Sequence, residues 1–346
     1  MLSWLRVGFV VVALAASGGC SPLDYYAQSI RGQLELLSSS RSIESIIADP
    51  GAENVLKQRL RQVLAARAFA THHLSLPDNK SYTRYADLGR RFVVWNVFAA
   101  PELSVVPREW CFPVVGCVIY RGYFRQDAAE RFAAQLQRRG DDVYVTGIAA
   151  YSTLGWFNDP VLNTMVHYQD TQLAGLIFHE LAHQLVYAKG DTVFNESFAT
   201  AVELEGVKRW LAYTGVDSDS YTRVKRHEGK IIDLISDYRA RLQTMYAESL
   251  TDQQKQHRKR EIFAELKARY AQLRDKHPTR GQGMDAWFAQ DLNNAHLASV
   301  GAYNELVPEF QRLLERHAGD LERFYQTVAV IAKLPVDQRQ RRLRDE

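Results

Sequence analysis

The sequence predicts an α+β fold that is mostly helical. Runs rich in β-branched and aromatic residues, such as Phe92–Phe98, belong to roughly the first 150 residues. From about Asp170 onward helix-forming residues dominate, and Tyr221–His277 contains one glycine and no proline. We therefore expect a small amount of sheet in the first half of the chain and long helices in the second.

Length and composition are typical of a folded globular protein. The chain has 346 residues, 46% of them hydrophobic and 24% charged. The 43 Lys and Arg nearly balance the 40 Asp and Glu, and we find no basic stripe with interleaved aromatics, so we expect no nucleic-acid partner. The most basic stretch, Arg339–Arg344, is interpreted as a solvated chain end. Nothing in the sequence indicates an oligomeric state.

The amino-terminal segment has the pattern that is typical of an export signal. Arg6 precedes the apolar run Val7–Ala16, and small residues stand directly before Cys20. The run is too short for a membrane-spanning helix, which needs about 20 residues. The pattern resembles a bacterial lipoprotein signal, which implies removal of residues 1–19, lipid attachment at Cys20 and a location in the cell envelope. The alternative is a simple secretory signal in which this cysteine is incidental.

Residues 20–150 are predicted to form an N-terminal α+β region. Helical periodicity runs from about Leu23 to Ala70 and is broken at Asp49–Gly51, which predicts two helices. After the strand at Phe92–Phe98, we expect a strand–helix–strand unit that buries a small sheet under a helix. Its expected parts are the strand Val118–Tyr120, the helix Gln126–Arg139 ended by Gly140, and the strand Asp142–Thr146.

Two further cysteines lie close together in this region. Cys111 and Cys117 flank five residues that include Pro113 and Gly116, both suited to a tight turn. In an exported protein such a pair is expected to form a disulfide. A redox-active pair or a metal site is the alternative, but these sites commonly use a spacing of two residues.

Residues 151–346 contain the segment that carries chemistry. Apolar residues recur at helical spacing in Leu173–Val186, with Asp170 or Thr171 available as cap and Gly190 as stop. His179 and His183 lie four apart, so both imidazoles share one face of this helix and can bind one ion. Glu180 stands beside that face, where it can deprotonate water. This is the spacing of a His-Glu-x-x-His zinc site.

A catalytic zinc site of this kind needs a third protein ligand. The next helix is expected after a turn at Asp191, and it carries both Glu196 and Glu203. Glu196 would complete a set of two histidines and one carboxylate, with a position left for water. Glu203 lies two turns along on the same face and is expected to accept a hydrogen bond from a ligand histidine. Glu203 as the third ligand is the alternative.

The residues around these ligands resemble the gluzincin metallopeptidases, and most of all the aminopeptidase N-type group. The resemblance rests on His-Glu-Leu-Ala-His-Gln followed by Asn-Glu-Ser-Phe-Ala. It implies a zincin-like core, one Zn²⁺ held by His179, His183 and Glu196, and Glu180 as the general base. The spacing from the second histidine to the third ligand is shorter here than in that group. The Gly-x-Met-Glu-Asn exopeptidase signature is absent.

The mature chain as a whole resembles a bacterial family of predicted aminopeptidases, whose members are typically lipoproteins. The resemblance implies a metallopeptidase with a zincin-like catalytic region over 151–346 and a helical carboxyl-terminal part. Besides the zinc residues, the matching landmarks are Leu76–Asn79, Trp110–Cys117, Tyr120–Phe124 and Tyr151–Phe157.

Two more features are candidates for the site. Tyr151–Pro160 precedes the zinc helix, where zincins often place the strand that pairs with substrate; Gly155 would allow close approach and Trp156 could form a pocket wall. A packed turn is the alternative. An oxyanion donor is also expected, and Tyr303 is favoured because it lies in a polar, small-residue interruption of the helical half. His296 could serve instead.

The sequence thus predicts an exported zinc metallopeptidase that hydrolyses peptides, with aminopeptidase activity implied by resemblance. An endopeptidase is equally compatible with these residues. A non-enzymatic envelope lipoprotein, with a structural zinc or a zincin-like binding module, is the alternative from another class. A fourth protein ligand would favour that alternative, because structural sites are usually closed.

Overall fold

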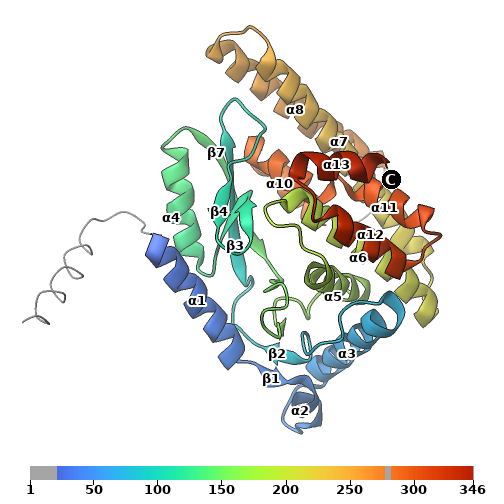
Figure 1. The fold of residues 1–346 in the computed structure, drawn as a ribbon. Helices are drawn as coiled ribbons and strands as arrows, with labels where there is room; N and C mark the ends of the chain where they lie inside the picture. The colour runs from blue at the N-terminus through green and yellow to red at the C-terminus, as the bar shows by residue number, and fades with distance from the viewer. Residues whose placement is uncertain (1–21, 277–281, 346) are drawn as a thin grey trace, which may run out of the picture.

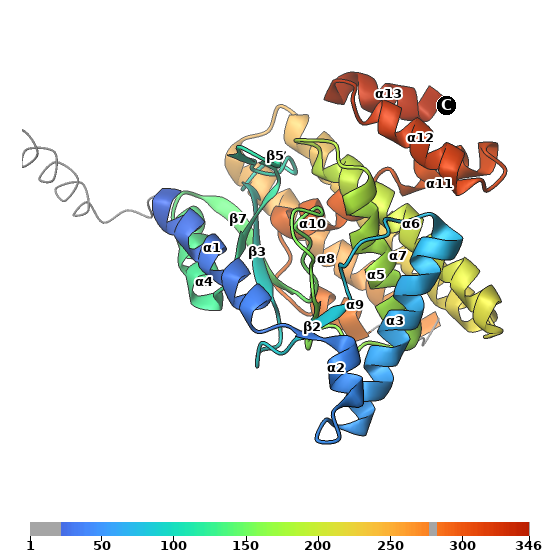
Figure 2. The same ribbon diagram turned by 60° about the horizontal axis from the view of Figure 1, so that its bottom comes forward.

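The computed structural model describes residues 22–276 and 282–345. The predictions for Cys20 and for the signal at 1–19 lie outside the described residues. Within them the fold is α+β and mostly helical, as expected. The main sheet, described below, and the two helices that cover it lie on one side of the molecule. Most of the remaining helices lie on the other side (Figures 1 and 2). Among the described residues, no helix has the length and apolarity that crossing a membrane requires.

The main sheet has three strands with β3 (Val94–Pro101) at its centre. Strands β6 (Tyr120–Tyr123) and β7 (Asp141–Ile148) both pair with β3 in antiparallel register. They therefore run parallel to each other, and α4 (Gln126–Gln137) connects them across one face. This is the predicted strand–helix–strand unit, with the predicted Phe92–Phe98 strand inserted between its two strands. Apolar residues of α4 and the sheet form a shared core.

The first helices surround a second, smaller sheet. Helix α1 (Pro22–Ser38) precedes its first strand, and α2 (Ile43–Ala48) and α3 (Asn54–Leu74) lie between its first and second strands in the chain. The chain breaks at Asp49–Gly51, as predicted, and also after Ser38, where the sequence analysis expected one continuous helix. The second break is made by β1 (Arg41–Ser42), which pairs with β2 (Arg84–Ala86); β2 also pairs with β8 (Val161–Leu162). Pairing with distant residues explains why local periodicity did not reveal it.

Beyond Leu162 the described residues form helices and connections only. Helix α5 packs against α6, and α7 and α8 form a long antiparallel pair (Figure 2). The helices of this half are α5 (Asp170–Leu185), α6 (Thr192–Thr214), α7 (Asp219–Ala247), α8 (Asp252–Lys276), α9 (Gln282–Phe288), α10 (Asn294–Asn304), α11 (Val307–Arg316), α12 (Leu321–Ile331) and α13 (Val336–Asp345).

The largest hydrophobic core draws residues from both halves of the sequence, between Leu36 and Leu343. Helices α5 and α6 lie at its centre. Gly206 of α6 lies so close to Phe178 that an added Cβ would come within 2.7 Å of the ring. This close packing fixes the two helices that carry the predicted metal ligands. The division of the chain at residue 150 stays a prediction.

The carboxyl-terminal basic stretch is not a solvated end, so that interpretation was wrong. Arg339 and Leu343 of α13 are buried, 4% and 1% exposed respectively. Arg339 forms an ion pair of 2.7 Å with Asp191, and its other Nη donates to the carbonyls of Ala332 and Leu334. Only one face of α13 packs against the core. Arg339 lies on that face, whereas the neighbouring arginines of the stretch are exposed, so the sequence alone did not distinguish it from them.

Candidate metal centre

Helix α5 carries the His-Glu-x-x-His segment through the core. Its capping box pairs Gln169 with Gln172, rather than using the predicted Asp170 or Thr171 as cap. His179, Glu180 and His183 are all buried. The helix ends at Leu185, two residues after His183, so the chain can turn directly into the segment that leads to the third ligand.

That turn is the connection Val186–Asp191, and α6 holds it in place. Asn195 donates from Nδ2 to the Ala188 carbonyl and accepts from the Ala188 amide, at 2.9 and 2.7 Å. Asp191 caps α6 by accepting a hydrogen bond from the Phe194 amide. Two short polar side chains thus fold the connection back onto α6. Glu196 follows within the second turn of that helix.

The structure brings His179, His183 and Glu196 together. One carboxylate oxygen of Glu196, Oε2, lies 3.3 Å from Nε2 of His179 and 3.5 Å from Nε2 of His183. The three side chains each offer one ligand atom, and these atoms lie within 4.8 Å of one another. This cluster could hold a metal ion. Among the described residues no other His, Cys, Asp and Glu set does so.

Glu203 takes the supporting position that the sequence analysis expected. Its Oε2 lies 3.2 Å from Nδ1 of His179, on the far side of the ring from Glu196. The hydrogen bond fixes the orientation of the imidazole and leaves Nε2 free to bind a cation. His183 differs, because its Nδ1 is buried with no hydrogen-bond partner. Orientation of the second histidine therefore depends on packing.

The cluster concentrates negative charge around the imidazoles. Burial lowers the pKa of His179, but its hydrogen bonds to the carboxylates of Glu196 and Glu203, together with their charges, outweigh burial and raise the pKa to about 10. Burial raises the pKa of Glu196, yet the neighbouring imidazoles of His183 and His179 bring it down to about 2. Burial raises the pKa of Glu203, but its hydrogen bond to His179 and the charge of His179 together outweigh burial and lower the pKa. Such a site favours a cation at its centre.

Glu180 has a different electrostatic environment from the two other glutamates. Burial raises its pKa above the usual value, and the imidazoles of His179 and His183 only partly oppose this effect. The charges of Glu196 and Glu203 act in the same direction as burial. A carboxylate with a raised pKa is a stronger base than an exposed one. Its position next to His179 in sequence places it beside the predicted ligands.

Two tyrosines, one on the sheet and one on a helix, lie close enough to the site for the charge of Glu196 to affect them. Tyr303 on α10 was predicted; Tyr120 on β6 was missed as a site residue, although it stands at the end of a predicted strand. Burial raises the pKa of both phenols well above the usual value, and the charges of Glu196 and Glu180 add to this effect. Both phenols are therefore protonated and able to donate. His296 instead stacks on Tyr144 with ring centroids 4.1 Å apart, and its Nδ1 contacts Asn293.

The segment Tyr151–Pro160, predicted to contact substrate, lies beside Gln184 of α5. An added Cβ on Gly155 would lie 3.8 Å from Gln184, which follows His183 directly, and Gly155 has a φ of +80°. Trp156 is 72% exposed and lines a pocket of about 370 Å³ with Leu37 and Arg84. Asp159 was not predicted as a site residue. Its carboxylate accepts hydrogen bonds from the Thr153 amide and hydroxyl and thereby holds the loop that contains Gly155 and Trp156.

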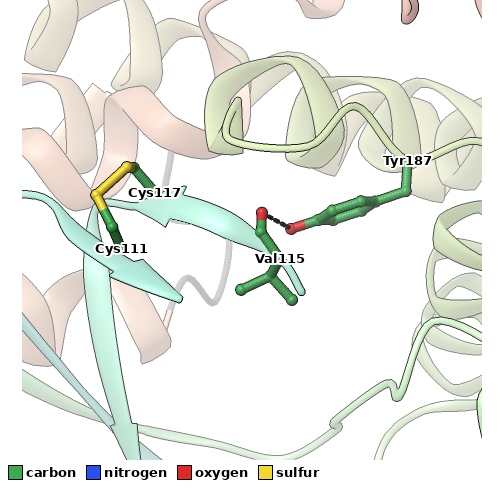
Figure 3. Close-up of a disulfide and its surroundings, with 4 residues drawn as sticks. All are labelled: Cys111, Val115, Cys117 and Tyr187. Carbon is green, nitrogen blue, oxygen red and sulfur yellow. Dashed lines mark hydrogen bonds between the residues drawn. A yellow bond between two sulfur atoms is a disulfide. The ribbon is translucent and has the colours of Figure 1, made fainter. Parts of the chain in front are cut away.

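The predicted disulfide between Cys111 and Cys117 is confirmed. It closes the hairpin formed by β4 (Trp110–Phe112) and β5 (Gly116–Val118). The turn of this hairpin faces the connection between α5 and α6, and the Tyr187 hydroxyl donates to the Val115 carbonyl (Figure 3). Burial is the main cause that raises the pKa of Tyr187 to about 12, and the negative charge of Glu196 adds to this effect.

Comparison with known proteins identifies the family. No curated protein and no solved structure shows a significant match to the chain. A family profile described as "Putative aminopeptidase" matches residues 24–343, which include all the described strands and every candidate metal ligand. The match covers nearly the whole of the described structure. The chain therefore belongs to this aminopeptidase family.

Proposed function

We propose that this protein is a zinc-dependent peptidase, most specifically an aminopeptidase. One observation carries the zinc assignment. Metal bonds of 2.0–2.1 Å at tetrahedral angles separate ligand atoms by about 3.3 Å. The Glu196 oxygen lies 3.3 and 3.5 Å from the two histidine nitrogens. Both carboxylate–imidazole distances are thus close to the separation expected of two ligands of one zinc ion.

The donor set also supports zinc. Two imidazoles and one carboxylate suit this ion better than Ca²⁺ or Mg²⁺, which prefer oxygen ligands. Three protein ligands are typical of a catalytic site, whereas structural zinc usually has four. Bound zinc would polarise a peptide carbonyl and lower the pKa of water. His179, His183 and Glu196 would hold it, and Glu203 would keep His179 oriented.

The remaining residues supply proton transfer and charge stabilisation. Glu180, with its raised pKa, accepts the proton of the attacking water and passes it to the departing amine. The protonated phenol of Tyr303 donates to the oxygen that becomes negative as the carbonyl is attacked. The tyrosine lies on a buried, regular helix, so the donor is positioned before the reaction begins.

Gly155 and Trp156 are proposed to contact the peptide substrate. The left-handed backbone at Gly155 and the exposed indole of Trp156 place an open surface beside Gln184. The family description supports action at a free amino terminus. Together with the lipoprotein-like signal, this gives a proposed role in trimming peptides in the bacterial cell envelope, with the chain attached to a membrane through lipid at Cys20.

Metal content and hydrolysis test the proposal together. Elemental analysis of the protein beginning after Cys20 should find about one zinc per chain, and Glu196→Ala should lose it. Glu180→Gln should retain zinc and lose at least about 100-fold in kcat. Substrates with free and acetylated amino termini distinguish an aminopeptidase from an endopeptidase. A folded protein without zinc after reconstitution, or Glu180→Gln with undiminished activity, would overturn the proposal.

A further inference from the structure

We propose that the disulfide-closed hairpin, residues 110–118, is a positioning element of the metal site. It acts by holding the connection Val186–Asp191, which joins the two helices that carry the ligands. The inference rests on the proposed metal site. It adds that ligand spacing depends on a covalent bond in a different part of the chain.

Hydrogen bonds join the turn of the hairpin to the connection. The Val115 carbonyl accepts from the Gly190 amide at 3.0 Å and from the Tyr187 hydroxyl at 3.2 Å (Figure 3). The Pro113 carbonyl accepts from Lys189 Nζ at 2.7 Å. Three residues of the connection are thus bound to two carbonyls of one short turn.

The backbones also touch directly. A Cβ added to Gly116 would lie 2.6 Å from the amide nitrogen of Gly190 and 2.8 Å from its Cα. These atoms are backbone, so they can make room only if the connection itself moves. The hairpin therefore limits where the connection can lie as well as bonding to it.

The position of the connection matters because it sets the distance between ligands. His183 lies two residues before the end of α5, and Glu196 lies in the second turn of α6. On the α6 side, Asn195 already fixes Ala188 through two hydrogen bonds. The hairpin fixes the following residues, Lys189 and Gly190. A shift there would pass to Glu196 and change its distance of 3.5 Å from His183 Nε2.

The hairpin itself depends on its disulfide. Its two strands have three residues each and pair with no other described strand. Trp110 and Phe112 pack against Phe132 and Tyr25, but the pairing of two such short strands is by itself only marginally stable. Cys111 and Cys117 are direct cross-strand partners, so the bond locks the register at the base of the turn. Opening the bond would free the Pro113 and Val115 carbonyls to move away from the connection.

A pair of glycine variants separates this contact from general backbone strain. Gly116 and Gly140 have nearly the same left-handed φ, +81° and +84°. Alanine at Gly116 meets the backbone of Gly190, whereas alanine at Gly140 meets nothing within 4 Å. Gly140→Ala is therefore the matched control for Gly116→Ala. Cys111→Ser/Cys117→Ser removes the covalent bond without adding bulk.

Two readouts should be measured for each variant. The first is hydrogen exchange of the Gly190 amide in metal-free protein, which reports the bond to Val115 without reference to activity. The second is zinc affinity by competition with a chelator. We expect Gly116→Ala and the double serine variant to exchange this amide about tenfold faster and to bind zinc about tenfold more weakly than Gly140→Ala. Reduction of the wild type with a water-soluble phosphine, which becomes phosphine oxide with oxygen from water as two thiols form, should give the same result.

The outcomes separate this inference from the proposed function. If wild type binds no zinc, the proposed function fails, and the exchange data still show whether the hairpin holds the connection. If wild type binds zinc and both hairpin variants match Gly140→Ala in exchange and affinity, the positioning role is overturned. A variant with faster exchange and unchanged zinc affinity also overturns it, because the contact would then be structural only.

Discussion

Replacement of Arg339 by methionine should destabilise the protein far more than its place in an arginine-rich tail suggests. The side chains of Arg339 and Asp191 are each 5% exposed and their charged atoms lie 2.7 Å apart. Methionine keeps most of the apolar stem but lacks the guanidinium, which also lies over the Phe194 ring, 5.3 Å from its centroid. The substitution therefore removes the positive charge, and it leaves the Asp191 carboxylate buried without a charged partner, with only its hydrogen bond from the Phe194 amide.

The expected cost follows from that unpaired charge. Removing one member of a buried ion pair typically costs 3–5 kcal/mol, so we expect Arg339→Met to lose about 4 kcal/mol of unfolding free energy. A chain of 346 residues has an unfolding entropy of about 0.7 kcal/mol/K, so the melting temperature should fall by about 4–7 °C. Asp191 also caps α6, five residues before Glu196, so zinc affinity should fall too.

Urea unfolding followed by circular dichroism measures this cost, with Arg341→Met as the control. Arg341 pairs with Asp337 on the same helix, but both side chains are about 70% exposed, so its loss should cost less than about 0.5 kcal/mol. Asp191→Asn combined with Arg339→Met should recover part of the loss, because no charge is then left buried. If Arg339→Met costs no more than Arg341→Met, the buried pair does not hold α13 to α6 and the reasoning is refuted.

Three further predictions concern the site. Glu203→Gln should weaken zinc binding by about 10–100-fold while leaving the three ligands in place, measured by chelator competition; unchanged affinity would remove Glu203 from a supporting role. Tyr303→Phe should lower kcat by about 100–1,000-fold with zinc retained; if Tyr120→Phe does so instead, the donor is the strand tyrosine. Burial raises the pKa of Asp159 to about 6, so its contribution to stability is present below about pH 4 and is lost as pH rises through 6. The free energy of unfolding of the wild type should therefore fall by up to about 3 kcal/mol between pH 4 and 7, and Asp159→Asn should remove this decrease. Urea unfolding across that pH range measures it, and an unchanged pH dependence in the variant would contradict the assignment.

The ligand cluster could be predicted because its information is local. The spacing of His179 and His183 has meaning only on a helix, and the apolar periodicity of Leu173–Val186 predicts one. Glu196 required one further step, a turn near Asp191 that sends the next helix back along the first. Asn195 and Asp191 provide that turn through side-chain hydrogen bonds to nearby backbone, which are short-range interactions.

The residues that were missed depend on contacts between distant parts of the chain. Tyr120 is the last residue of a predicted strand, but its approach to Glu196 depends on how the sheet packs against the helical half. The short strand β1 exists only because β2 pairs with it more than 40 residues later. Arg339 looks like its exposed neighbours in sequence, and its partner Asp191 lies 148 residues away. No periodicity within a window of one helix carries that information.

Contacts from several segments of the chain meet at the connection Val186–Asp191, which explains why so short a connection is held so firmly. Metal–ligand distances tolerate deviations of only about 0.2 Å, whereas a loop between two helices is ordinarily among the more mobile parts of a fold. Val186–Asp191 is fixed at Ala188 by α6, at Gly190 by the hairpin and at Asp191 by α13. Each restraint comes from a different segment, so the precision of the site depends on the whole fold. The proposed zinc ligands could be predicted from two short motifs, but the geometry that brings them together is a property of the complete chain.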